Sequence, residues 1–122
     1  ELLRRWKARG IRLAVATANH EKLFAPALRR AGIYDCFDAF TTLAEVKRGK
    51  GFPDIYLRTA EKLALPPADC LVLEDILAGI RGARAGGFQT AAVADPSNRH
   101  SREALAREAD LFLQDFSEAL RW

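Results

Sequence analysis

The chain has 122 residues, of which 49% are hydrophobic and 29% are charged, and this composition is typical of one globular domain. It excludes a disordered tail, and no apolar stretch approaches the roughly 20 residues that a membrane helix needs. With 19 basic and 16 acidic residues the formal net charge is +3, but the basic residues are scattered, so we expect no nucleic-acid partner.

Helices and strands alternate in the first part of the chain. Apolar residues at helical spacing predict an amphipathic helix over residues 2–9, and the apolar run at residues 12–17 (RLAVAT) predicts a buried strand. Asn19 is a suitable N-cap for a second helix, which we expect to end at Gly32. Residues 39–43 then predict a second strand.

The same alternation continues to the end of the chain. The pattern predicts helices at residues 53–63, at residues 77–85 and after Ser101, and strands at residues 70–73, 89–94 and 111–113. Asp115 and Glu118 have the spacing of a capping box. This alternation predicts a single α/β domain over residues 1–122, in which a parallel sheet lies between two layers of helices.

Cysteine usage and the start of the chain bear on its cellular context. Cys36 and Cys70 form no CxxC pair, so we expect reduced packing residues rather than a disulfide or a zinc site. No signal-peptide pattern opens the sequence, and we expect a cytoplasmic protein with no membrane partner. Because the chain has no methionine and opens at Glu1 within a predicted helix, we expect the C-terminal portion of a longer polypeptide.

Three groups of polar residues follow predicted strands or precede predicted helices, where open parallel sheets bind their ligands. The first group is Thr17, Ala18 and Asn19, which combine a hydroxyl with backbone amides at a helix start and suit a bound phosphate. Alternatively, Thr17 is simply a helix cap. The local pattern leaves both interpretations open.

The second group is Glu74 and Asp75, adjacent carboxylates at the end of the most hydrophobic predicted strand. Two neighbouring acids repel each other and lose hydration there, and a hard, oxygen-seeking cation such as Mg²⁺ offsets this cost. In the alternative interpretation Asp75 caps the following helix and Glu74 lies at the surface.

The third group is Lys50, which lies within RGKGFPDIY just before the helix that Pro53 begins. Its ammonium group, carried on a flexible stem beside a glycine, can reach over the crevice and neutralise a phosphoryl oxygen. Lys47, three residues earlier, is the rival candidate. We expect Lys50 to reach the crevice and Lys47 to point to solvent.

The order of these motifs resembles that of the haloacid dehalogenase-like hydrolases, in the branch that contains β-phosphoglucomutase and phosphoglycolate phosphatase. A strand ending in threonine is followed by GK and PDIY, then by a strand ending in Glu-Asp and by an alanine-rich helix that contains GI and closes with AGG. The resemblance covers nearly the whole chain. It implies the family's Rossmann-like three-layer α/β/α core with a parallel sheet.

The resemblance gives each polar group a role. It implies a phosphate site at Thr17, Ala18, Asn19 and Lys50, a Mg²⁺ site at Glu74 and Asp75, and catalytic roles for Lys50 and Asp75. Within this set, Thr17 supplies the phosphate-binding hydroxyl and Lys50 holds the phosphoryl group and the nucleophile. We expect Thr17, Lys50 and Asp75 to converge on one crevice at the carboxyl end of the sheet.

The chain departs from the family pattern at three points. Gly51 follows the lysine where the family usually has proline, and Ile76 follows the acidic pair where it usually has serine. The family's DxD motif, which supplies the nucleophile and the general acid, does not occur in the 122 residues. Asp35 and Asp38 have a different spacing and a loop context. We therefore expect the nucleophile strand and the helical cap to lie outside this chain.

The function implied by the resemblance is magnesium-dependent phosphoryl transfer through a phosphoaspartate, with a small phosphorylated metabolite as substrate. Dehalogenation within the same family needs no metal and leaves Glu74 and Asp75 without a purpose. The alternative from another class is a non-catalytic α/β binding or interaction module.

The absent nucleophile strand also has a consequence for the sheet. In the family's fold it lies between the strands expected at residues 12–17 and 70–73, so its absence opens the sheet in the middle. We expect a separate N-terminal segment to complete the sheet, a second copy of the chain to associate with it, or the two strands to pair directly.

Overall fold

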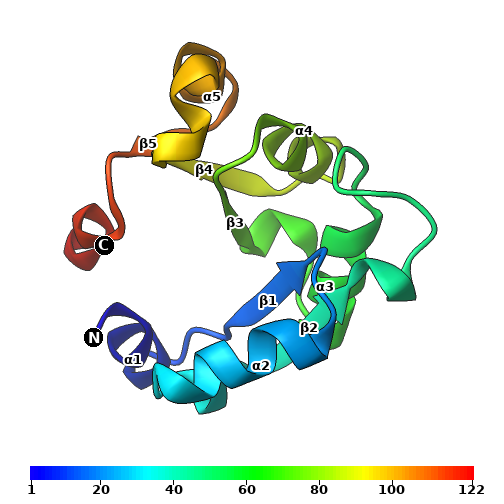
Figure 1. The fold of residues 1–122 in the computed structure, drawn as a ribbon, viewed down its shortest axis with the longest axis vertical. Helices are drawn as coiled ribbons and strands as arrows, with labels where there is room; N and C mark the ends of the chain where they lie inside the picture. The colour runs from blue at the N-terminus through cyan, green and yellow to red at the C-terminus, as the bar shows by residue number, and fades with distance from the viewer.

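The computed structural model describes all 122 residues, as an α/β fold of two parallel sheets with helices packed against them (Figure 1). The α-helices are α1 (Leu2–Ala8), α2 (Glu21–Arg30), α3 (Asp54–Leu63), α4 (Leu77–Ala85) and α5 (Arg102–Glu108). The strands are β1 (Ala14–Thr17), β2 (Ala39–Thr42), β3 (Leu71–Glu74), β4 (Gln89–Val93) and β5 (Leu111–Leu113). The predicted fold class is confirmed.

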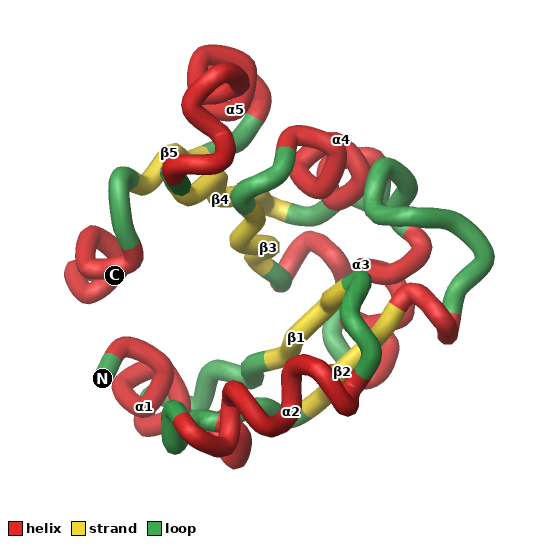
Figure 2. The backbone as a smooth tube through the Cα atoms, viewed as in Figure 1, coloured by secondary structure: helices red, strands yellow, loops and turns green.

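The sheet is divided in the middle. β1 pairs in parallel with β2, while β3, β4 and β5 form a separate parallel sheet in that order. The tube drawing shows the two sets of strands facing each other across the molecule (Figure 2). β1 and β3 do not pair with each other, so direct pairing, one of the three alternatives expected for the open sheet, does not occur, while an added N-terminal segment and a second copy stay open.

Helices α3 and α4 join the two halves. α3 packs against β1 and β2, α4 packs against β3 and β4, and the two helices contact each other. Each helix buries one face, as the spacing of its buried residues shows. These residues are Ile55, Tyr56, Thr59 and Ala60 in α3, and Gly79, Ile80, Gly82 and Ala83 in α4. None of the helices has the length and apolar character that crossing a membrane requires.

The two ends of the chain meet on the opposite side of the molecule (Figure 1). The rings of Trp6 and Trp122 stack with their centroids 6.0 Å apart, and Arg9 Nη1 donates to the Trp122 carbonyl oxygen at 2.6 Å. Trp6 also belongs to a buried cluster with Leu13, Cys36, Val93, Leu113 and Ala119, which includes residues of both halves. The N-terminal helix and the C-terminal turn therefore pack against each other.

Most predicted boundaries differ from the observed ones by one or two residues, and the cap of α2 differs in kind. The N-cap is His20, whose Nδ1 accepts from the Lys22 amide at 3.2 Å, so the prediction of Asn19 as the cap is wrong. The Asn19 amide instead donates to Thr17 Oγ1 at 3.0 Å. Cys36 is buried and Cys70 half-buried, and neither forms a disulfide.

Asp38 ties α1 to the start of the first sheet, and this contact predicts part of the acid sensitivity of the chain. Lys7 Nζ donates to both carboxylate oxygens at 2.8 Å and the Leu13 amide donates to Oδ2 at 2.8 Å. The bond from Lys7, followed by that from Leu13, holds the pKa of Asp38 below its ordinary value of 3.8. The stabilisation is therefore complete above pH 3.8 and is lost as the pH falls further.

We accordingly expect Asp38→Asn to flatten the pH dependence of the unfolding free energy below pH 3.8. Urea unfolding followed by circular dichroism across a pH series measures this slope. The control is Asp35→Asn. The Asp35 side chain lies in the adjacent turn, is 80% exposed, and has its Oδ1 3.8 Å from Arg4 Nη2. Equal slopes for wild type and Asp38→Asn would contradict the prediction.

Candidate active site

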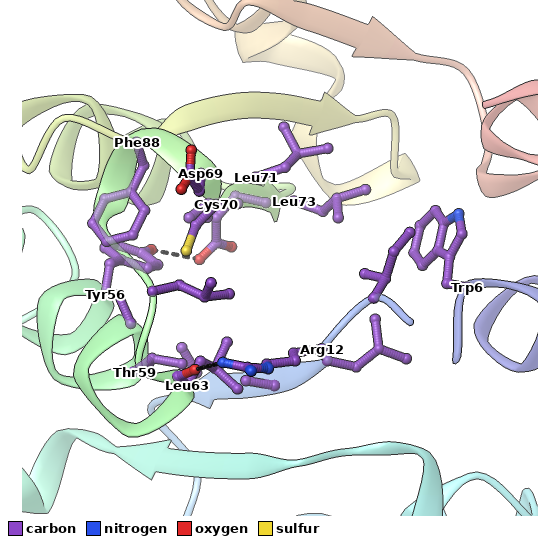
Figure 3. A pocket seen from close by; sticks show the side chains of 18 of the residues that line it. Trp6, Arg12, Tyr56, Thr59, Leu63, Asp69, Cys70, Leu71, Leu73 and Phe88 are labelled. Carbon is purple, nitrogen blue, oxygen red and sulfur yellow. Dashed lines mark hydrogen bonds between the residues drawn. The ribbon is translucent and has the colours of Figure 1, made fainter. Parts of the chain in front are cut away.

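A cavity of about 700 Å³ lies between the unpaired edges of β1 and β3. Its lining is mainly apolar and comes from β1, α3 and β3, from the segment between α1 and β1, and from Phe88 and both tryptophans. Figure 3 shows Trp6 at one end and Tyr56 with Phe88 at the other. The cavity is thus bounded on two sides by strand edges, and Glu74 brings a carboxylate to its wall.

Glu74, the last residue of β3, is the centre of a buried polar cluster. It is 8% exposed, and its Oε2 accepts hydrogen bonds from Lys50 Nζ and from the Tyr56 hydroxyl, each at 2.7 Å. The bond from Tyr56 is dashed in Figure 3. Burial, and then the negative charge of Glu74, raise the pKa of Tyr56 above its ordinary value of 10.0, so the hydroxyl remains a donor.

Lys50, and not Lys47, faces the carboxyl end of β3. The Lys50 side chain is 20% exposed and ion-paired with Glu74, whereas Lys47 is exposed to solvent. The exposure of Lys47 agrees with its predicted orientation, and Lys50 faces Glu74, but that Lys50 reaches a crevice shared with Thr17 and Asp75 stays a prediction. That Lys50 holds a phosphoryl group stays a prediction.

Thr17, Ala18 and Asn19 form a turn at the carboxyl end of β1. The Thr17 hydroxyl accepts from the Asn19 amide, which is the local capping role that the sequence left open. Thr17 is half-buried, and Ala18 and Asn19 are exposed. No hydrogen bond links these residues to Lys50 or Glu74, and their convergence with Lys50 and Asp75 stays a prediction.

Asp75 follows Glu74 and is held through its backbone. Its carbonyl oxygen accepts from Asn98 Nδ2 at 2.9 Å, and the same amide donates to the Val93 carbonyl at 3.0 Å. Asn98 is 4% exposed and ties the carboxyl ends of β3 and β4 together. The sequence analysis missed Asn98, although its capping-box spacing with Asp95 marks an ordered turn.

The carboxylates of Glu74 and Asp75 suit a hard cation. Mg²⁺ is commonly bound by one or two carboxylates, with water and substrate phosphate as the other ligands. The Asp75 carboxylate accepts no hydrogen bond from the chain, and Glu74 Oε1 is free of the bonds made to Oε2. No group of three or more His, Cys, Asp or Glu side chains gathers anywhere in the chain, so further ligands would come from elsewhere.

A comparison with protein families decides the classification of the chain. The family model for haloacid dehalogenase-like hydrolases matches residues 1–87. The chain belongs to the haloacid dehalogenase-like hydrolases. Two curated relatives are protein CbbY of Rhodobacter capsulatus, 41% identical over 98% of this chain, and β-phosphoglucomutase of Bacillus subtilis, 33% identical over 85%. The chain spans 52% of the first relative and 45% of the second, or about half of each.

Solved structures of haloacid dehalogenase-like proteins have the same fold. A crystal structure of CbbY from Rhodobacter sphaeroides in complex with xylulose bisphosphate superposes with a TM-score of 0.86 at 32% identity. A second one, in complex with phosphate, superposes with a TM-score of 0.87 at 33% identity. Each comparison covers 96% of this chain and 52% of the CbbY chain.

Proposed function

We propose that this chain carries the phosphate-holding and metal-holding part of a magnesium-dependent phosphatase or phosphomutase. The observation that carries the proposal is the bond from the half-buried Lys50 Nζ to the buried carboxylate of Glu74, at the carboxyl end of β3 and directly before Asp75. Family membership supports phosphoryl transfer as the chemistry. The bound ligands of the CbbY structures support a small phosphorylated sugar as the class of substrate.

In this proposal each side chain has a defined task. The Thr17 hydroxyl, which accepts from Asn19, keeps its proton free to donate to a phosphoryl oxygen, and the Ala18 amide donates beside it. Lys50 is held at Glu74 and adds positive charge where the transferred phosphoryl group gains negative charge.

Asp75 and Glu74 would hold the proposed Mg²⁺, which would supply positive charge for the phosphoryl oxygens. Tyr56 donates to Oε2 of Glu74 and so fixes the carboxylate. The nucleophile is an aspartate on a segment outside these 122 residues, since they contain no DxD motif. Its carboxylate oxygen would bond to phosphorus as the bond from phosphorus to the leaving oxygen breaks. The second aspartate of the DxD motif would protonate the leaving oxygen and then take a proton from the water that hydrolyses the phosphoaspartate.

The cavity is the proposed place of that segment. The facing edges of β1 and β3 carry backbone groups with no strand partner, and such edges pair readily with an added strand. The apolar lining suits valine or isoleucine side chains on the two faces of a strand. A second copy of the chain is the alternative source.

Turnover tests the proposal directly. We expect residues 1–122 alone to release no phosphate from a phosphate ester at any Mg²⁺ concentration, because they lack the nucleophile. A polypeptide that also carries the DxD segment should hydrolyse the ester with Mg²⁺, and Asp75→Asn should lower the rate by about 100-fold or more.

Asp35→Asn in the same polypeptide is the control, because Asp35 is an exposed carboxyl that pairs with Arg4 and makes no bond to Lys50, Tyr56 or Glu74. Turnover by residues 1–122 alone would refute the assignment of an external nucleophile. Phosphate binding without turnover in the longer polypeptide would favour the non-catalytic binding module.

A further inference from the structure

The loop that carries Lys50 rests directly on α4 at Gly82. A β-carbon at position 82 would overlap with the Lys50 carbonyl oxygen and lie 2.8 Å from that of Phe52. Both obstacles are backbone atoms, so neither can rotate away as a side chain does. A residue with no side chain at position 82 is therefore required for this loop to dock where it does.

A clamp between Arg48 and Asp54 spans the same loop. Arg48 Nε donates to both carboxylate oxygens of Asp54, at 3.1 and 3.2 Å, and its Nη2 donates to Oδ1 at 2.7 Å. The Arg48 guanidinium also lies 4.4 Å from the centroid of the Phe52 ring. The fork joins residues on either side of Lys50 and shortens the free length of the loop.

Both partners of the ion pair pack on one face of α4. A β-carbon at Gly79, one turn before Gly82, would lie 2.6 Å from Glu74 Cδ. Gly79 thus leaves room for the carboxylate that accepts from Lys50, and Gly82 leaves room for the backbone that presents Lys50. The relative position of the two charged groups follows from the docking of the loop on this helix.

We propose that Gly82 and the Arg48–Asp54 clamp are positioning elements for Lys50, which set its ammonium group at Glu74. That the position of Lys50 matters for phosphoryl transfer rests on the proposed function. The docking of the Lys50 loop on α4 does not depend on that function, and it can be measured without turnover. Failure of the activity assay and failure of this inference are therefore distinguishable.

The experiment measures the acylation rate of each lysine by mass spectrometry, with acetyl N-hydroxysuccinimide as the probe. In the wild-type chain we expect Lys50 to react about tenfold more slowly than exposed Lys47, because its amine is bonded to a buried carboxylate. In Gly82→Ala the displaced loop should remove most of this difference and leave the rate of Lys47 unchanged.

Gly51→Ala is the matched control, because a β-carbon there meets nothing within 4 Å. It should keep the slow rate of Lys50. Without the overlap, Gly82→Ala would raise the thermal midpoint, because alanine forms helices better than glycine. If Gly82→Ala raises the midpoint of thermal unfolding and Lys50 is still acylated slowly, the proposed role of Gly82 is wrong.

Arg48→Gln is the second variant, and it adds no atoms to α4. It should raise the Lys50 rate by releasing the clamp, whereas Arg58→Gln, which removes an equal charge from an exposed pair on α3, should not. If Gly82→Ala does not fold, Arg48→Gln decides the test. A Lys50 rate that is unchanged in Arg48→Gln, or raised equally in Arg58→Gln, overturns the proposal.

Discussion

Lys50→Ala is expected to lower the free energy of unfolding by about 3 kcal/mol at neutral pH, because it leaves a charged carboxylate in a buried place. Glu74 is 8% exposed and would keep only the bond from Tyr56. Lys47→Ala, three residues away on the exposed side of the same loop, should change the value by no more than about 0.5 kcal/mol. Urea unfolding of both variants measures the difference.

A double variant separates the lost charge partner from lost packing. Lys50→Ala combined with Glu74→Gln removes the unpaired charge and should recover part of the stability of the single variant. If the double variant is no more stable than Lys50→Ala alone, packing of the lysine stem accounts for the effect. Equal losses for Lys47→Ala and Lys50→Ala would contradict the buried ion pair itself.

A short peptide with a run of valine and isoleucine, flanked by lysines, is expected to bind in the cavity and stabilise the chain. Both facing edges can then form hydrogen-bonded ladders with the peptide, and the apolar lining is removed from water. At a peptide concentration 100 times the Kd, the gain in unfolding free energy is about 2.7 kcal/mol. Trp6 and Trp122, the only tryptophans, both line the cavity, so their fluorescence reports occupancy.

The control peptide has proline at the centre of the run, which removes an amide donor and interrupts the ladder. It should neither stabilise the chain nor change the fluorescence. The same response to both peptides would show apolar binding without strand pairing, and no response to either would contradict the proposed place of the missing strand. If the chain forms dimers and the valine-isoleucine peptide dissociates them, a second copy of the chain is the partner that occupies the cavity.

Local patterns in the sequence were sufficient to predict the five α-helices and five strands, but not the short 3-10 helices between them. The apolar run before Glu74 predicts β3 to within one residue, and the proline with an acid after it predicts the start of α3. The cap at His20 was missed because Asn19 is the better cap by type, and its amide is instead turned back to Thr17. Which of the two residues caps α2 depends on the direction in which the chain leaves β1.

Contacts between distant segments could not be predicted in this way. The bond from Tyr56 to Glu74 joins residues 18 positions apart, and the space at Gly82 has meaning only once the Lys50 loop lies on α4. In the sequence, Gly82 looks like a weak point of a helix. The need for glycine at position 82 follows only from the structure, in which the carbonyl groups of Lys50 and Phe52 occupy the space that a side chain would take.

The packing of the chain ends has a kinetic consequence. The halves contact each other through α3 and α4, and at the chain ends through the stacked rings of Trp6 and Trp122, two residues that also line the cavity. We expect a strand to enter on the side of the chain ends as the contact between Trp6 and Trp122 parts. The frequency of that parting limits how fast a strand enters, while the two edges determine how long it stays.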